Sequence, residues 1–236
     1  MFPAMLMLSA ASAFEVQTVA SGAEMHWGEM PVSYAWAGGD SPAIPRIVEA
    51  IDASYDAWAA IDDAYVFVDA RNTALAPTVE LDDENLVFFT TDWPDGNEAL
   101  AITTTWTDEE GAVVQYDIHI NATVAWSTTG AAEAYDLQAA ITHEVGHVLG
   151  LGHSAVEDST MFAKHELADV HRRELHDDDR AAARYLYDEP PPEAENTGDP
   201  PDTGGAALCA TGPVDPRTIA ILVGLPLFAF ARRGVR

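Results

Sequence analysis

The segment that decides both fold and chemistry spans residues 143–153 and reads His-Glu-Val-Gly-His-Val-Leu-Gly-Leu-Gly-His. Residues four apart on a helix project to the same side, so His143 and His147 can present their imidazoles to one metal ion. Glu144 follows the first histidine and can reach a water at the metal without being a ligand. Gly150 lets the chain leave the helix in a backbone conformation that is costly for other residues. That turn can return His153 as a third ligand.

Three neutral imidazoles predict a catalytic zinc site, because they leave the +2 ion with an open coordination position. Zinc in such a site lowers the pKa of its water toward ~7 and polarises a carbonyl. The alternative is a helix that merely carries histidines. The third histidine, the spaced glycine and the apolar helical face together argue against it.

Apolar periodicity around this segment predicts a single domain in which strands and helices follow each other. The expected strands are residues 30–36, 65–69, 86–91, 100–107 and 112–122, the last two joined by a hairpin turn at 108–111. The expected helices are one capped by Ser41 with Pro42 at its first position, one from near Asp136 to Gly150, and one from Asp177 through Tyr187. This order predicts an α/β (α+β) domain with a mixed sheet.

Composition excludes several classes of protein. The 236 residues include 39 acidic and 11 basic side chains, giving a formal net charge of -28. A surface this negative repels phosphate backbones, so nucleic acid is not an expected partner. Cys209 is the one cysteine, which excludes an intramolecular disulfide within the sequence. We expect a monomer.

The two ends of the sequence have the composition of targeting segments. Residues 1–13 combine an apolar stretch with a small-residue cleavage pattern, which predicts a secretory signal peptide, although its charged region is missing. The alternative is a buried N-terminal segment. Residues 189–208 form an acidic linker rich in proline and glycine. Residues 209–236 carry an apolar run and then arginines, as a membrane or sorting segment would.

The motif and its surroundings resemble the metzincin metalloproteases, and Ser154 after the third histidine resembles the matrixin branch (matrix metalloproteinase-like). Ser159-Thr160-Met161 lies where the Met-turn of that family falls, so the resemblance places Met161 beneath the zinc. Residues 175–187 resemble the final helix of the family, and residues 117–121 resemble the strand before its active-site helix. The tail resembles bacterial surface-sorting tails, with a plain tail anchor as the alternative.

The resemblance implies a zincin-like fold, with a five-stranded, mostly parallel twisted sheet, one antiparallel edge strand and three helices. It also implies endopeptidase activity, in which zinc and Glu144 activate a water that attacks the scissile carbonyl. The edge strand would be residues 100–105, and its threonines Thr103, Thr104 and Thr105 would bind substrate by strand addition. The loop 162–174 would wall the primed-side specificity pocket.

Other residues depart from the family pattern or leave alternatives open. No cysteine precedes the domain, so the cysteine-based latency of the family is not expected. His119 is expected to be a strand residue and not a ligand, so we predict one zinc ion. Asp92, Asp95 and Asn97 are candidate calcium ligands, with an ordinary acidic turn as the alternative. Arg172 and Arg173 either meet an acidic substrate or lie in a solvated loop.

These observations predict a secreted or cell-surface zinc endopeptidase that acts on protein or peptide substrates. A different metzincin branch is one alternative. A surface binding or adhesion module that keeps an inactive metal site is the other. The presence of Glu144 favours the enzyme, since a binding module has no use for this carboxylate.

Overall fold

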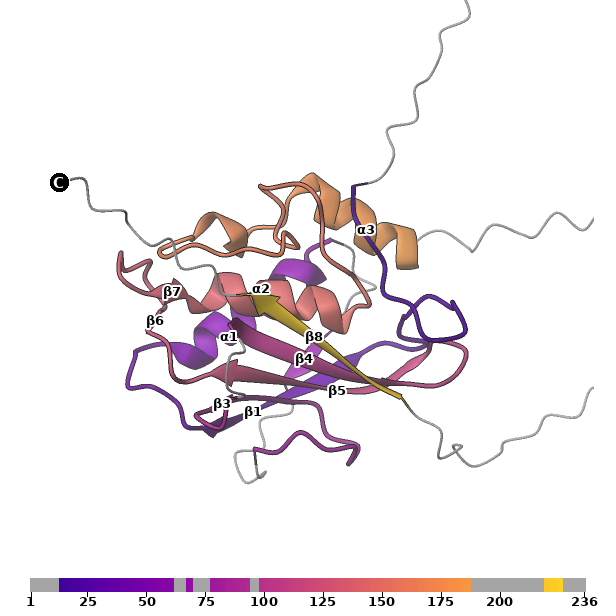
Figure 1. Ribbon diagram of the computed structural model, residues 1–236, viewed down its shortest axis with the longest axis horizontal. Helices are drawn as coiled ribbons and strands as arrows, with labels where there is room; N and C mark the ends of the chain where they lie inside the picture. The colour runs from indigo at the N-terminus through magenta and orange to yellow at the C-terminus, as the bar shows by residue number, and fades with distance from the viewer. Residues whose placement is uncertain (1–12, 62–66, 70–76, 94–97, 188–218, 227–236) are drawn as a thin grey trace, which may run out of the picture.

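The computed structural model describes residues 13–61, 67–69, 77–93, 98–187 and 219–226. A strand, a helix, further strands and two helices follow one another in the order that the sequence predicts, and one more strand comes after the last helix (Figure 1). The elements are β1 (Val32–Gly39), α1 (Ile47–Ala59), β2 (Phe67–Asp69), β3 (Leu86–Thr90), β4 (Ala99–Thr107), β5 (Val113–Asn121), β6 (Trp126–Ser127), β7 (Tyr135–Asp136), α2 (Leu137–Val148), the 3-10 turn η1 (His171–Arg173), α3 (Asp177–Tyr187) and β8 (Ile219–Pro226).

The main sheet has the strand order β2-β1-β3-β5-β4-β8. β2, β1, β3 and β5 run parallel to one another, and β4 runs antiparallel to β5. This five-stranded part agrees with the expected topology. The sheet nevertheless has six strands and not five, because β8 pairs with β4 as well. Its sequence Ile-Ala-Ile-Leu-Val supplies the β-branched residues that favour a strand.

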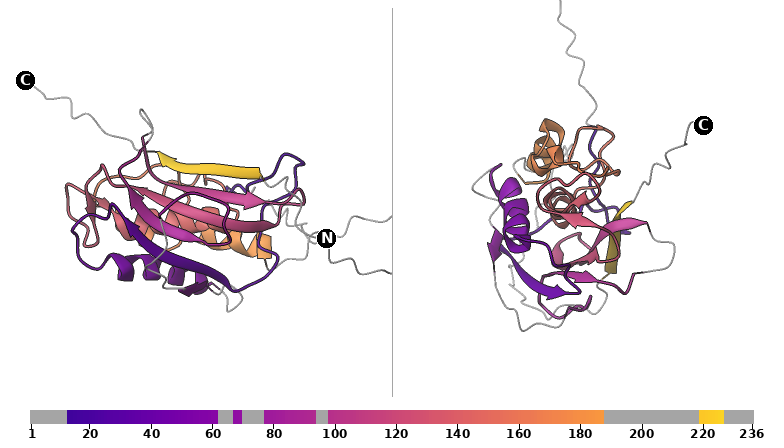
Figure 2. Two further views of the ribbon diagram at one scale, coloured as in Figure 1. Left: turned by 90° about the horizontal axis from the view of Figure 1, so that it is seen from below. Right: turned by 90° about the vertical axis from the view of Figure 1, so that its left-hand side faces the viewer.

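α1 and α2 pack against each other on one side of the sheet, and the core lies between them and the strands (Figure 2). Trp58 and Tyr55 of α1 are fully buried there, and the Trp58 indole donates a hydrogen bond of 2.8 Å to the carbonyl of Thr142 on α2. Burial of a side chain of this size stabilises the fold by about 1.5–3 kcal/mol. The packing fixes α2, which carries the histidine motif, against the sheet.

The start of α1 differs from the prediction. The helix begins at Ile47 after Arg46, not at a Ser41 cap with Pro42 in the first turn. Pro45 is the reason, since proline disfavours the helical conformation of the residue before it. Ile44 therefore lies outside the helix, although it still packs against the core as a partly buried residue.

The ends of α2 and the position of α3 confirm the prediction. The Asp136 side chain accepts a hydrogen bond of 3.1 Å from the amide of Ala139, which caps the first turn of α2. Gly150 has φ +96°, and a Cβ there would overlap the carbonyl oxygen of Met25. The expected hairpin turn also forms, with the amide of Asp108 donating to the carbonyl of Ala112 over 3.0 Å.

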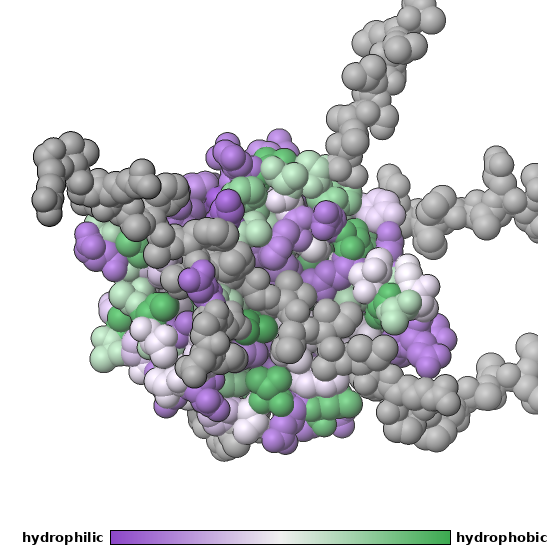
Figure 3. Space-filling model, in the orientation of Figure 1, coloured by the Kyte–Doolittle hydropathy of each residue, from purple (hydrophilic) through white to green (hydrophobic). Residues whose placement is uncertain are grey.

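Hydrophilic residues spread over the face of the molecule seen in Figure 3, with hydrophobic ones in small patches between them. Of the expected terminal segments, the linker 189–208 lies outside the described residues, as do all of 1–13 except Ala13 and all of 209–236 except residues 219–226. No helix in the described ranges is long and apolar enough to cross a membrane.

Candidate metal centre

Three histidines converge at the end of α2. His143 and His147 lie one turn apart on this helix, and His153 lies in the loop that follows. Each offers a ring nitrogen within 4.8 Å of the others. The Nε2 atoms of all three are buried and have no hydrogen-bond partner among the described residues. An unpartnered buried nitrogen is costly, and a shared metal ion would satisfy all three.

The second ring nitrogens orient two of these side chains. Nδ1 of His143 lies 2.7 Å from the carbonyl oxygen of Thr160, and Nδ1 of His147 lies 2.8 Å from that of Leu151. A proton donated from Nδ1 to each carbonyl leaves the Nε2 lone pair available to a metal.

Burial also keeps the imidazoles neutral. It lowers the pKa of His147 to about 3 and the pKa of His143 well below its usual range, with the neighbouring histidines adding to the effect. Neutral imidazole is the form that binds a metal. Three such nitrogens with a fourth side open fit a catalytic zinc ion.

The loop that carries His153 is held by the N-terminal segment. The amide of Gly152 donates to the carbonyl of Glu15 over 2.8 Å, and the amide of Gln17 donates to the carbonyl of Gly150 over 2.8 Å. The Gln17 side chain also donates to the carbonyl of Leu151 over 2.9 Å. Sequence reasoning missed this role, since residues 14–18 carry no periodicity or motif that connects them to residues 150–153.

Glu144 lies beside the histidines with one oxygen anchored. Its Oε2 accepts a hydrogen bond of 2.6 Å from the Thr103 hydroxyl on β4. Its Oε1 is buried and has no partner among the described residues. Burial raises the pKa of Glu144 to about 8, although the bond from Thr103 opposes this shift. The divalent charge of a bound ion would favour the carboxylate form.

Met161 underlies α2, as the resemblance implies. Its side chain is buried. A Cβ at Gly146 would overlap Met161 Sδ and come within 2.9 Å of Trp58 Cζ2, so the helix needs glycine here to approach the methionine. The Met-turn is thus fixed against the helix that supplies two of the histidines.

Two aspartates at the start of α3 fix the loop around this methionine. Asp179 is buried, and its carboxylate accepts hydrogen bonds from the amides of Thr160 (2.8 Å) and Met161 (3.0 Å). Asp178 accepts one of 2.6 Å from the Ser154 hydroxyl, next to His153. Asp178 and Asp179 therefore connect α3 to the third histidine and to the Met-turn.

The three threonines expected to bind substrate differ in the partners of their hydroxyl groups. The Thr103 hydroxyl is bonded to Glu144, while the Thr104 and Thr105 hydroxyls are buried with no partner among the described residues. Their backbone does not form a free edge. Thr103 pairs with Val223 of β8, and Thr104 pairs with Leu222.

The remaining candidates are the expected calcium ligands and His119. Asp92 is exposed, and Asp95 and Asn97 fall outside the described residues, so the calcium hypothesis stays a prediction. His119 lies in β5 next to Trp93, with ring centroids 5.4 Å apart. The group of described histidines that could share one metal ion consists of His143, His147 and His153.

The arginines of the 162–174 loop are structural, which sequence reasoning missed. Arg172 is buried, pairs with Asp169 over 3.1 Å and donates to the carbonyl of Glu157 over 2.8 Å. The expectation of a solvated loop was therefore wrong for this residue. The cause is that the loop folds back and presents its carbonyls to one guanidinium, a contact that residue spacing does not reveal.

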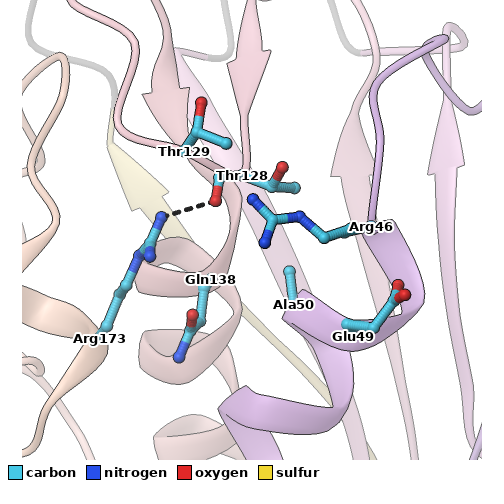
Figure 4. Close-up of a pocket in the computed structure, with 7 residues that line it drawn as sticks. All are labelled: Arg46, Glu49, Ala50, Thr128, Thr129, Gln138 and Arg173. Atoms are coloured by element: carbon cyan, nitrogen blue, oxygen red, sulfur yellow. Dashed lines mark hydrogen bonds between the residues drawn. The ribbon is translucent and has the colours of Figure 1, made fainter.

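Arg173 lines a separate pocket between the starts of α1 and α2, where Arg46 also points inward (Figure 4). The Arg173 guanidinium donates to the carbonyl of Thr128 over 2.9 Å and forms an ion pair of 2.6 Å with Asp136, the cap of α2. This pair connects the loop to the helix of the metal centre.

Fold and site together define a zincin-type metallopeptidase domain, in which a mixed sheet supports a helix bearing two of three metal-binding histidines. The sequence matches the matrixin family (peptidase M10) over residues 48–188, more than half of the chain. The chain therefore belongs to the matrixin family.

The chain is also similar in sequence to individual metalloproteinases. The chain is 29% identical over 143 residues to metalloendoproteinase 2-MMP of Arabidopsis thaliana, a match that covers 58% of this chain and 37% of that protein. It is 33% identical over 82 residues to matrix metalloproteinase-18 of Xenopus laevis, covering 35% of this chain and 17% of that protein. The chain thus spans 37% of the length of the first of these curated relatives and 17% of the length of the second.

Proposed function

We propose that the chain is a zinc-dependent endopeptidase that hydrolyses peptide bonds in extended protein substrates. The observation that carries this proposal is the set of three buried, unpartnered Nε2 atoms beside a glutamate with one anchored and one free oxygen. His143, His147 and His153 would hold the metal. Zinc bound there supplies a Lewis acid that polarises a carbonyl and makes water more acidic.

Glu144 acts as the general base and then as the general acid. Thr103 fixes Oε2, so Oε1 is the atom free to accept a proton from the attacking water and pass it to the leaving amine. Burial raises the pKa of this carboxyl, whereas the bond from Thr103 and the charge of a bound metal ion would favour the carboxylate that a general base requires. Met161 and Asp179 position the histidines, and the backbone of β4 binds the substrate by strand addition.

The proposal extends to the place of action. Residues 1–13 would direct export, the acidic segment 189–208 would separate the domain from the surface, and residues 209–236 would attach it there. Support comes from composition: apolar ends, a linker rich in proline and glycine, and four arginines after residue 216. A secreted or surface-attached bacterial enzyme that acts as a monomer fits this arrangement, and calcium at Asp92, Asp95 and Asn97 is part of the proposal.

A surface-attached binding or adhesion module with an inactive metal site is the second candidate. The observation that would favour it is the occupation of the β4 edge by β8, since a peptide would need that edge to pair with β4. Against it stands Glu144, whose bond to Thr103 and free oxygen a binding module would not require.

The first prediction separates the two candidates. Glu144→Gln keeps the side-chain volume but removes the base, so we expect hydrolysis of an unfolded protein such as casein to fall by about 10²–10⁴-fold while zinc content stays at one per chain. Zinc is measured by mass spectrometry and hydrolysis by fluorescence. Both are measured on the intact chain and on a chain cut within residues 189–208.

The exposed Glu133→Gln is the matched control and should change neither readout. Equal hydrolysis by the parent chain and Glu144→Gln would reject the enzyme. One bound zinc with no hydrolysis in any form would favour the binding module.

A further inference from the structure

We propose that Ile219–Pro226 is an internal inhibitory strand, which occupies the place on β4 where an extended substrate binds. This inference rests on the proposed peptidase function, because peptidase activity is what the strand would inhibit. The occupation of the edge itself does not depend on that function. The chain would therefore be self-inhibited until this segment leaves the sheet.

The register of β8 carries the inference. It runs antiparallel to β4 along nearly the whole strand, from the pair Thr107–Ile219 to the pair Ala99–Pro226. Figure 2 shows β8 as the outermost strand, beside β4. An edge strand presents a row of free N–H and C=O groups that can pair with another chain, and β8 takes up that row.

β8 also lies beside the elements that carry the proposed catalytic residues. Val223 pairs with Thr103, the residue whose hydroxyl holds Glu144 over 2.6 Å. β8 also contacts α2, the helix of His143 and His147. A peptide held by strand addition to β4 would need this backbone position, so β8 and a substrate exclude each other.

Burial of the edge agrees with this occupation. Every residue of β4 is buried, although the strand would otherwise end the sheet. β8 itself contains no charged residue in an otherwise acidic chain, so no charge opposes its addition to the sheet. Its eight residues match the nine of β4 in length.

The connection makes the contact intramolecular. Tyr187 at the end of α3 and Ile219 at the start of β8 are separated by residues 188–218. Pairing within one chain proceeds at an effective concentration that is on the order of a millimolar for short linkers, so even a weak strand would compete with substrate. One segment cannot pair with β4 and lie in a membrane at once. Membrane insertion or cleavage of the tail would therefore free the edge.

The test uses the full chain with a specific protease site placed within residues 189–208, purified intact and then cut. Cutting followed by removal of the tail should raise kcat/KM for a fluorogenic peptide at least tenfold, mainly by lowering KM. Hydrogen exchange of the amides in residues 99–107 should speed up in parallel. A synthetic peptide of residues 217–228 should reverse both changes.

A second variant removes the pairing without a cut. Successive residues of a strand direct their N–H groups to opposite sides, so Ile221→Pro together with Leu222→Pro removes the donor facing β4 whichever residue supplies it. We expect this double variant to show the kcat/KM of the cut chain and the same rate of hydrogen exchange in residues 99–107. The control pair, Ala206→Pro and Ala207→Pro, lies in the proline-rich linker region and should behave as the parent chain.

The outcomes are distinguishable. Unchanged exchange of residues 99–107 after cutting would overturn the inhibitory strand, as would hydrolysis of the chain's own bonds within residues 219–226, which would make the segment a substrate. Faster exchange without peptide hydrolysis in either form would reject the proposed function and leave the strand occupation standing.

Discussion

Thr103 and Glu144 show how a single hydroxyl can set the properties of the carboxyl that we propose as the base. Burial raises the pKa of Glu144, and the 2.6 Å bond from Thr103 acts in the opposite direction because it favours the charged form. The same bond leaves Oε1 as the one oxygen free to take a proton. Neither effect involves a metal ligand, so both can be tested with the metal centre intact.

Thr103→Val keeps the shape of the side chain and removes the hydroxyl. We expect kcat/KM to fall about tenfold, and the acid limb of its pH profile to move to higher pH, since the carboxylate loses a stabilising bond. Thr105→Val is the matched control, because the Thr105 hydroxyl is buried with no partner among the described residues. If the acid limb lies at the same pH in Thr103→Val and in the parent chain, the Thr103 hydroxyl does not influence the pKa of Glu144.

The burial of His119 should make the free energy of unfolding depend on pH. Burial lowers its pKa to about 4, while in the unfolded chain it titrates near 6.5. Between these values the unfolded state binds more protons, so the free energy of unfolding falls as the pH drops from 7 to 5, by about 2 kcal/mol from this residue.

His119→Phe should remove that part of the pH dependence while keeping the ring contacts with Phe88 and Trp93. Urea unfolding at pH 7 and pH 5 measures it. The control is His26→Phe, at a partly exposed site outside the sheet. Equal pH dependence in His119→Phe and the parent chain would contradict the prediction.

The elements of this fold are joined at their ends by side chains from distant segments. The start of α2 is capped by Asp136, which is itself paired with Arg173 of η1. The end of α2 is covered from two sides. Trp27 donates to the carbonyl of Val148 over 2.8 Å, and Tyr187 donates to that of Leu149 over 2.8 Å. The helix of the metal centre is thereby fixed at both ends.

Arg173→Ala should lower the free energy of unfolding by about 3 kcal/mol, because it leaves the carboxylate of Asp136 buried without its cation. Chemical denaturation measures this loss. Arg46→Ala is the control, since Arg46 lines the same pocket but is exposed (Figure 4). Similar losses in the two variants would show that the ion pair does not stabilise α2.

At the scale of the whole molecule, the metal centre joins segments from both ends of the domain. The N-terminal residues 15–17 pair with the loop before His153, and α3 binds the Met-turn through Asp179. Binding of a metal to the histidines should therefore stabilise the domain as a unit. At free zinc 1,000-fold above Kd this stabilisation is about 4 kcal/mol.

Removal of zinc by a chelator should lower Tm, and added zinc should raise it again, with the logarithm of the free zinc concentration. Differential scanning calorimetry measures the shift. Glu144→Gln should show the same shift as the parent chain, because it keeps all three histidines. A Tm that does not respond to chelator or zinc would show that the histidines hold no metal in solution.

The sequence by itself determined the parts of the protein that depend on short-range spacing. The interval between His143 and His147 sets both ligands on one helix face, and Gly150 marks where that helix ends. α3 and the 108–111 turn follow from local pattern in the same way. In α1, the pattern found the helix but not its start, because Pro45 overrides the Ser41 cap.

The tertiary structure decided what depends on contacts between distant residues. The bond of Thr103 to Glu144, the burial of Arg172, the support of the His153 loop by Gln17 and the sixth strand all join segments far apart in the chain. Periodicity reports only whether a segment can be a strand. Which edge that strand joins depends on the free backbone groups that the folded sheet presents, and these exist only once the other strands have assembled.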